Sequence, residues 1–130
     1  MKKILSILFL SVSCFMSAQV SYMYSDKNMN SYTVKDTEIK YEPVQAQESS
    51  SGMYSGGEQK IKIITPFELN KITSVFDEAV ADTLSHEKQR RMGSGLFIRY
   101  NKNKVEKKMI IKYDSETQKK IETLLHSLIQ

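Results

Sequence analysis

Apolar residues recur at helical spacing in the middle of the chain, directly after a strong helix-start signal. Residues 65–68 (Thr-Pro-Phe-Glu) combine a capping threonine, a proline at the first helical position and a glutamate that completes a capping box. The apolar positions that follow share one helical face: Leu69, Ile72, Phe76, Ala79, Val80 and Leu84. The pattern predicts a helix that begins at Pro66 and runs toward Arg91, and Ser85 leaves open a second, short helix.

The end of the chain repeats this pattern. Ser115 and Gln118 stand at capping-box spacing and precede an apolar stripe at helical spacing, formed by Ile121, Leu124, Leu125, Leu128 and Ile129. Between the two predicted helices, residues 96–100 and 105–113 are rich in strand formers and flank a polar turn that contains asparagine. These segments predict an antiparallel hairpin, and residues 60–64 predict a short strand before the first helix.

Residues 20–57 have no comparable regularity. Residues 20–30 are polar and aromatic without a sustained period, and residues 45–57 have the serine, glycine and glutamine composition of a linker. Partial alternation between these two stretches predicts a short hairpin or an edge strand, based on Tyr32, Val34, Ile39 and Tyr41. We therefore expect residues 19–57 to form a flexible arm with a possible short hairpin and a Ser/Gly linker.

The element order in residues 58–130 is strand, helix, strand, strand, helix. This order predicts an α+β domain in which one or two helices pack on one face of a small antiparallel sheet. A core of this size supplies only about 3–5 kcal/mol of net stability. We therefore expect either that the hairpin near Tyr32 adds to the sheet or that the chain forms a homodimer.

The first 18 residues have the layout of an export signal. Lys2 and Lys3 precede an apolar run at residues 4–15, and small and polar residues follow up to Ala18. The apolar run is shorter than the roughly 20 residues that span a bilayer, so no membrane span is predicted. We expect cleavage after Ala18 and a periplasmic or secreted protein. The alternative is a lipoprotein anchored at Cys14, although the residues before Cys14 lack the leucine of lipoprotein signals.

Charge and cysteine content exclude several classes of function. The chain has 19 Lys and Arg against 15 Asp and Glu, and without the two lysines of residues 1–18 the net charge is +2. Nucleic-acid binding normally requires a strongly basic, clustered face, so no nucleic-acid partner is expected. The single cysteine, Cys14, lies in the predicted signal. The remaining chain therefore has no disulfide, no thiol nucleophile and no cysteine-bound metal.

The sequence contains no complete catalytic motif. His86 and Glu87 begin a sequence like the zinc motif HExxH, but Arg90 occupies the position of the second histidine. Residues 93–95 (Gly-Ser-Gly) do not have the glycine spacing of a nucleophile elbow. With only one other histidine, His126, a zinc site is not expected either. We predict no catalytic residue, no metal ligand and no cofactor.

Candidate binding residues fall into two groups. An open sheet leaves unpaired backbone groups that accept an added strand, so we expect partner contacts at its edges, at Ile61, Ile63, Arg99, Lys107 and Lys108. Two basic pairs would form a patch for an anionic ligand if folding brought them together: Arg90 with Arg91, and Lys102 with Lys104.

The order helix, glycine, strand, turn, strand, helix over residues 66–130 is similar to that of the C-terminal domain of TonB-type proteins, which contact outer-membrane receptors by pairing strands. The chain departs from that family in having no proline-rich spacer, no retained membrane anchor and no glycine in the hairpin turn. The resemblance implies contact through strands. We predict a non-catalytic, exported module of the bacterial cell envelope that binds a protein or peptide. The alternative is a small secreted enzyme or enzyme inhibitor with a site of scattered polar residues.

Overall fold

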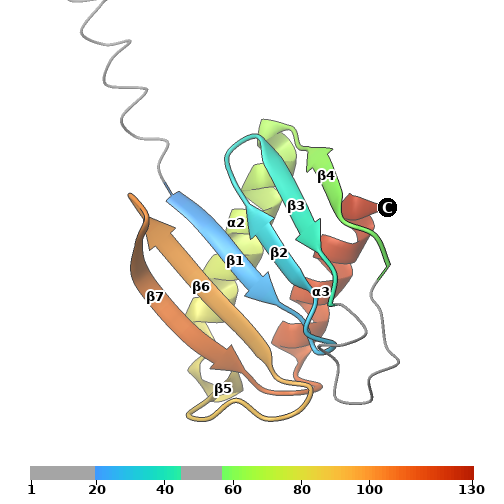
Figure 1. The fold of residues 1–130 in the computed structure, drawn as a ribbon. Coiled ribbons are helices and arrows are strands. Elements are labelled where there is room, and N and C mark those ends of the chain that lie inside the picture. The colour runs from blue at the N-terminus through green and yellow to red at the C-terminus, as the bar shows by residue number, and fades with distance from the viewer. Residues whose placement is uncertain (1–19, 45–56) are drawn as a thin grey trace, which may run out of the picture.

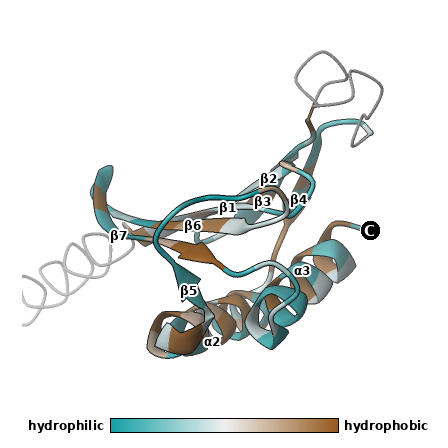
Figure 2. Cartoon of the chain, turned by 90° about the horizontal axis from the view of Figure 1, so that it is seen from below, coloured by the Kyte–Doolittle hydropathy of each residue, from teal (hydrophilic) through white to brown (hydrophobic). Residues whose placement is uncertain are grey.

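A seven-stranded antiparallel sheet forms the body of the protein in the computed structural model, which describes residues 20–44 and 57–130 (Figure 1). The strand order is β4-β3-β2-β1-β6-β7-β5. The strands are β1 (Val20–Ser25), β2 (Ser31–Val34), β3 (Glu38–Glu42), β4 (Lys60–Ile63), β5 (His86–Glu87), β6 (Gly95–Asn101) and β7 (Lys104–Ile111). Helices α2 (Pro66–Ala81) and α3 (Glu116–Ile129) lie side by side on one face of the sheet (Figure 2). The predicted α+β class is confirmed, but the sheet is larger than the small sheet predicted. The predicted order of strand, helix, strand, strand and helix in the C-terminal half is also incomplete, because a 3-10 turn and strand β5 stand between α2 and β6.

The larger sheet arises because residues 20–44 lie within it and do not form the predicted arm. Strand β1 pairs with β2 on one side and with β6 on the other, so it lies at the centre of the sheet. Its side chains Tyr22 and Tyr24 are buried beneath the helices. The predicted hairpin is present as β2 and β3, in the interior of the sheet. The signal boundary and most of the predicted Ser/Gly linker fall outside the described residues.

Helix α2 begins as the sequence predicts and ends earlier. The Thr65 hydroxyl accepts a hydrogen bond from the Glu68 backbone N–H (3.1 Å), and the Glu68 carboxylate accepts one from the Thr65 N–H (2.9 Å), which confirms the capping box. The helix stops at Ala81 and does not run toward Arg91. The next residue, Asp82, accepts hydrogen bonds at its carboxylate from Ser85 and from α3, and these bonds turn the chain into the 3-10 turn η2 (Thr83–Ser85).

The C-terminal half follows the predicted hairpin and helix. Strands β6 and β7 form an antiparallel pair with a register shift between Arg99 and Tyr100. The Ser115 hydroxyl caps α3 by accepting from the Gln118 N–H (3.1 Å). The buried Gln118 side chain also donates to the Gly93 carbonyl (2.7 Å), so it links α3 to the loop before β6.

The core lies between the sheet and the two helices and is rich in aromatic residues. The Phe76 ring on α2 packs 5.0 Å from the Tyr22 ring and 4.8 Å from the Phe97 ring, measured between centroids. Ile121 and Leu125 of α3 are buried in the same core. Neither helix, nor any other helical segment in the described ranges, combines the length and apolarity required to cross a bilayer.

Candidate functional site

Strand β4 is an outer strand of the sheet and carries two of the predicted contact residues, Ile61 and Ile63. It pairs with β3, from Lys60 opposite Tyr41 to Ile63 opposite Glu38. In the described ranges, no strand lies on its outer side. Ile61 and Ile63 are 60% and 74% exposed, although isoleucine is among the residues most often buried. We call residues 60–63 with this open side the β4 edge.

One hydrogen bond fixes which backbone groups of the β4 edge point outward. The Ile64 N–H donates to the Thr37 carbonyl of the adjoining turn (3.0 Å). In an antiparallel ladder, hydrogen-bonded and non-bonded pairs alternate, so Lys62 bonds to β3 as Ile64 does. Ile61 and Ile63 therefore direct their N–H and C=O groups away from β3. Such free groups can pair with another strand.

The two faces of the β4 edge differ in chemistry. Directly opposite residues of paired strands share a face, so Lys60 lies on the helix side with the buried Tyr41 opposite it. Lys62 lies on the same side, and its Nζ donates to the Gln130 backbone oxygen (3.3 Å). Ile61 and Ile63 alternate with these lysines and lie on the face without helices. An added strand would therefore meet a basic row on one face and an apolar row on the other.

The other predicted partner contacts lie on the β6–β7 hairpin. Arg99 is engaged within the protein: its Nη1 lies 3.8 Å from Asp77 of α2 and its Nη2 lies 3.5 Å from Glu106. Lys107 and Lys108 are exposed on β7. Strand β5 pairs only with the last two residues of β7, so part of β7 forms a second edge. Lysines on an edge discourage strand pairing, so β4 is the better candidate.

The predicted anionic patch is not assembled as one surface. Arg90 lies in the loop before β6, where its Nη2 donates to the Ser25 hydroxyl (2.7 Å), and Arg91 is next to it. Lys102 and Lys104 lie at the hairpin turn beyond the other end of β6. A strand of seven residues separates the two pairs by about 20 Å.

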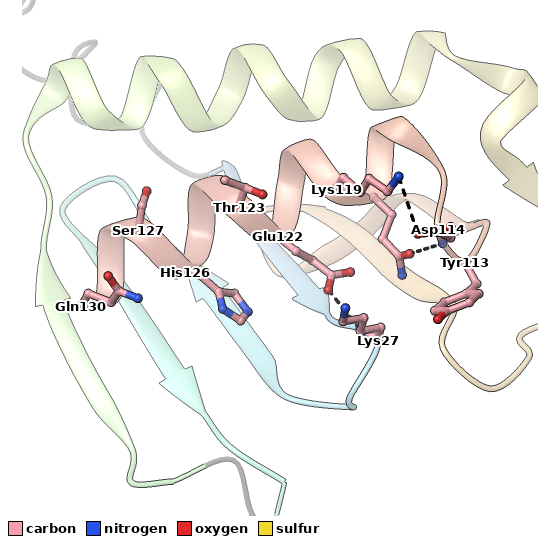
Figure 3. Close-up of a pocket in the computed structure, with 10 residues that line it drawn as sticks. Lys27, Tyr113, Asp114, Lys119, Glu122, Thr123, His126, Ser127 and Gln130 are labelled. Atoms are coloured by element: carbon pink, nitrogen blue, oxygen red, sulfur yellow. Dashed lines mark hydrogen bonds and ion pairs between the residues drawn. The ribbon is translucent and has the colours of Figure 1, made fainter.

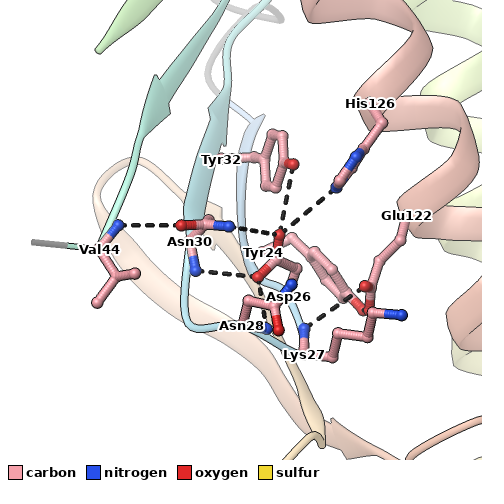
Figure 4. A network of polar contacts seen from close by, with 9 residues as sticks. All are labelled: Tyr24, Asp26, Lys27, Asn28, Asn30, Tyr32, Val44, Glu122 and His126. Atoms are coloured by element: carbon pink, nitrogen blue, oxygen red, sulfur yellow. Dashed lines mark hydrogen bonds and ion pairs between the residues drawn. The ribbon is translucent and has the colours of Figure 1, made fainter. Parts of the chain in front are cut away.

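A second candidate is a group of buried polar side chains at the end of the β1–β2 hairpin, which we call the polar cluster (Figure 4). At its centre is the buried carboxylate of Asp26. The Asp26 Oδ1 accepts from the backbone N–H groups of Asn28 and Asn30 (2.9 Å each). The Asp26 Oδ2 lies 3.3 Å from the Asn30 amide nitrogen, 3.5 Å from the Tyr32 hydroxyl and 3.6 Å from His126 Nε2.

Glu122 of α3 is the second carboxylate of the polar cluster. The Tyr24 hydroxyl donates to Glu122 Oε2 (2.8 Å), and the Lys27 backbone N–H approaches Oε1 (3.5 Å). Burial raises the pKa of Glu122, and the negative charge of Asp26 acts in the same direction. Burial also raises the pKa of Tyr24 and of Tyr32, so both hydroxyls stay protonated and available as donors.

The bonding pattern gives the polar cluster a structural role. Both oxygens of Asp26 are approached by donors of the protein, which fix the turn that carries Met29 in a left-handed conformation (φ 68°). The Asn30 side chain accepts from the Val44 N–H (3.0 Å), so the same turn also holds the end of the β3 segment. A carboxylate occupied in this way is not placed to take a proton from a substrate.

A groove of about 470 Å³ runs along α3 beside the polar cluster (Figure 3). Its lining mixes charges of both signs, with Lys27 and Lys119 near Asp114 and Glu122, and includes the half-exposed His126. In residues 20–44 and 57–130, no group of three histidine, cysteine, aspartate or glutamate side chains is arranged to hold a metal ion. The other histidine, His86, contacts the Ala79 carbonyl through Nε2 (2.8 Å).

The polar cluster carries no signature in the sequence. Tyr24 and Glu122 are 98 positions apart, and Lys27 and Glu122 are 95 apart. The sequence places His126 next to an apolar stripe but does not show that Asp26 lies across from it. Glutamate on a helix is usually solvated, so Glu122 does not stand out among the other acidic residues of the chain.

The buried Glu122 predicts a specific pH dependence of stability. Its folded-state pKa lies above the ordinary value of 4.5, so its contribution is most favourable at low pH and is lost as pH rises through the folded-state pKa. We expect the free energy of unfolding of the wild type, relative to Glu122→Gln, to be lower at pH 8 than at pH 4. Each unit by which the folded-state pKa of Glu122 exceeds the unfolded-state pKa changes the free energy of unfolding by about 1.4 kcal/mol. Urea denaturation of both proteins at several pH values measures this difference.

Glu78→Gln is the matched control, because it removes the same charge from an exposed position on α2. It should not reproduce the pH-dependent difference. If the difference in free energy of unfolding between the wild type and Glu122→Gln is the same at both pH values, folding does not raise the pKa of Glu122.

Comparison of the chain with protein-family models, with curated proteins and with solved structures finds no match.

Proposed function

We infer that the protein is an exported, non-catalytic module that binds a protein or peptide of the cell envelope by adding a strand to the β4 edge. The observation that carries this proposal is the orientation of the β4 edge. Ile61 and Ile63 direct backbone hydrogen-bonding groups away from the sheet, and their side chains are largely exposed. Strand addition uses main-chain hydrogen bonds for affinity and alternate side chains for specificity.

Export is part of the proposal and depends on residues 1–18. Their charged start, short apolar run and Ala18–Gln19 junction together suit a cleaved signal. The intact mass of protein isolated from the cell envelope should show loss of residues 1–18. A lipid on Cys14 would replace this with a lipoprotein, and a full-length cytoplasmic chain would contradict export.

An enzymatic role finds less support. A substrate of such an enzyme would bind in the groove along α3. The Asp26 carboxylate beside this groove, however, already accepts hydrogen bonds from other groups of the protein. Glu122 is likewise bonded to the Tyr24 hydroxyl. The acidic groups next to the groove therefore hold the fold together and are not poised for acid–base chemistry.

Substitution of proline at Ile61 tests the proposed function. The Ile61 N–H points away from β3, so Ile61→Pro removes a free donor without removing a ladder hydrogen bond. We expect a folded protein whose thermal unfolding is close to that of the wild type but whose capture of envelope partners is reduced at least tenfold. The measurement is quantitative crosslinking and capture by the tagged protein, with circular dichroism to establish folding.

Two further variants separate backbone from side-chain effects. Ile61→Thr keeps the N–H and the strand propensity, so it should retain more partner binding than Ile61→Pro. Lys62→Pro removes an N–H that bonds to β3, so it should destabilise the sheet. If folded Ile61→Pro captures the same partners as the wild type in the same amounts, strand addition at β4 is wrong.

A further inference from the structure

The chemistry of the β4 edge indicates what kind of strand it accepts. We propose that the occupant is an extended peptide segment in which acidic and apolar residues alternate, with acidic side chains beside Lys60 and Lys62 and apolar side chains beside Ile61 and Ile63. This inference rests on the proposed function. It adds the chemical class of the partner.

The charges around the β4 edge leave its lysines available. In the described part of the chain, neither Lys60 nor Lys62 lies within ion-pair distance of an aspartate or glutamate side chain. Glu42 of the neighbouring strand β3 is paired with Lys40 (3.3 Å) and lies on the face of the sheet opposite Lys60 and Lys62. Lys62 contacts the backbone oxygen of Gln130 (3.3 Å). Both lysines are exposed and can therefore pair with acidic residues on an added strand.

The apolar row supplies the other half of the specificity. Side chains directly opposite on adjacent strands lie about 4.5–5.5 Å apart between Cβ atoms, so apolar residues of a partner would cover Ile61 and Ile63. Because successive side chains of a strand point to opposite faces, the partner must alternate with the same period of two. An acidic residue at every second position therefore meets the lysine row and an apolar residue meets the isoleucine row.

The same lysines disfavour a second copy of the chain as the occupant. When two copies pair antiparallel through the β4 edge, the residues with outward backbone groups must lie opposite each other. Ile61 of one copy therefore lies opposite Ile61 or Ile63 of the other, or Ile63 lies opposite Ile63. In a register centred on Ile61, Lys60 faces Lys62 of the second copy. In a register centred on Lys62, Lys62 faces itself. The third register, centred on Ile63, places Lys62 opposite Ile64 and extends the pairing past β4 to Thr65, which caps helix α2. Like charges directly opposite destabilise a strand pair, so the first two registers are disfavoured relative to an acidic peptide.

Two synthetic peptides test the proposal with the full chain. Both have seven residues; one alternates valine with glutamate, and the other replaces each glutamate with lysine. We expect calorimetry at low ionic strength to show the glutamate peptide binding about tenfold tighter or more, because two cross-strand charge pairs change sign between the peptides. A double variant with Lys60→Glu and Lys62→Glu should reverse the preference, and Ile61→Pro should weaken binding of both peptides.

The outcomes separate the partner class from the proposed function. Equal binding of both peptides, lost in Ile61→Pro, would overturn the acidic preference and leave strand addition intact. Binding of neither peptide, or binding unaffected by Ile61→Pro, would overturn the inference, and the capture experiment with Ile61→Pro decides the function separately. A wild-type dimer in sedimentation that dissociates in Ile61→Pro would identify a second copy as the occupant and would also overturn it.

Discussion

Replacement of Phe76 with alanine is expected to lower the free energy of unfolding by about 3–5 kcal/mol, the range for truncation of a buried phenylalanine. The Phe76 side chain is 1% exposed and packs against Tyr22 of β1 and Phe97 of β6. These contacts join α2 to the two central strands. Truncation would remove apolar burial and leave a cavity that the surrounding rings cannot fill without moving. Urea denaturation followed by circular dichroism measures the loss.

Phe67→Ala is the matched control on the same helix. Phe67 is 71% exposed, and the Lys71 ammonium lies 5.5 Å from its ring centroid. Its truncation should change the free energy of unfolding by no more than about 0.5 kcal/mol. If Phe67→Ala and Phe76→Ala lower the free energy of unfolding by similar amounts, α2 does not pack on the sheet through the helix face that carries Phe76.

Gly95→Ala is expected to cost about 2–4 kcal/mol, although it adds a single methyl group. A Cβ at Gly95 would collide with the hydroxyl and ring of Tyr24. The Tyr24 ring cannot move away easily, because it is fully buried and its hydroxyl donates to Glu122 (2.8 Å). The substitution therefore forces either strain at the start of β6 or loss of a buried hydrogen bond. The drop in thermal unfolding temperature and in the urea midpoint measures the cost.

A double-mutant cycle identifies the cause of this loss. Tyr24→Phe removes the hydroxyl that the new methyl group would meet, so Gly95→Ala should cost less in the Tyr24→Phe background than in the wild type. Strictly additive effects of the two substitutions would show that the Tyr24 hydroxyl is not what excludes a side chain at residue 95.

Local sequence patterns predicted the elements whose determinants lie within a few residues. The capping box at Thr65 and the cap at Ser115 are both present, and the apolar stripes of both helices face the core through Ile72, Phe76 and Ile121. These features depend on spacing along the chain, which the sequence displays directly. The short strand before α2 and the β6–β7 hairpin were predicted for the same reason.

Features that depend on distant residues were not predicted. Strand β1 is short, and Met23 interrupts the polar face that Ser21 and Ser25 form opposite Tyr22 and Tyr24, so its alternation is weak. Its pairing with β6 has no local signal. The end of α2 was placed too late because the carboxylate that redirects the chain, Asp82, acts by accepting hydrogen bonds from Ser85 and from Thr117 of α3.

The candidate site was predicted in part. Ile61 and Ile63 were named as contacts because they lie on a predicted strand at an open sheet edge, but the direction of their backbone groups follows from the Ile64–Thr37 hydrogen bond, which no sequence pattern reveals. Arg99 was named as a contact because it lies on a predicted strand. Its side chain lies opposite the buried Tyr22, on the helix face of the sheet, and is paired with Asp77 and Glu106.

The central position of β1 has a consequence for the order of folding. The β1–β2–β3 meander and the β6–β7 hairpin each join strands that are neighbours along the chain, so each can form early. Among the described strands, the meander and the hairpin pair with each other along β1 and β6, and β6 begins at residue 95. Contacts of such high sequence separation form slowly. A chain synthesised from its N-terminus therefore presents the tyrosine-rich strand β1 as an open edge until β6 (Gly95–Asn101) has been synthesised, and during that interval it is most exposed to chaperones and to aggregation.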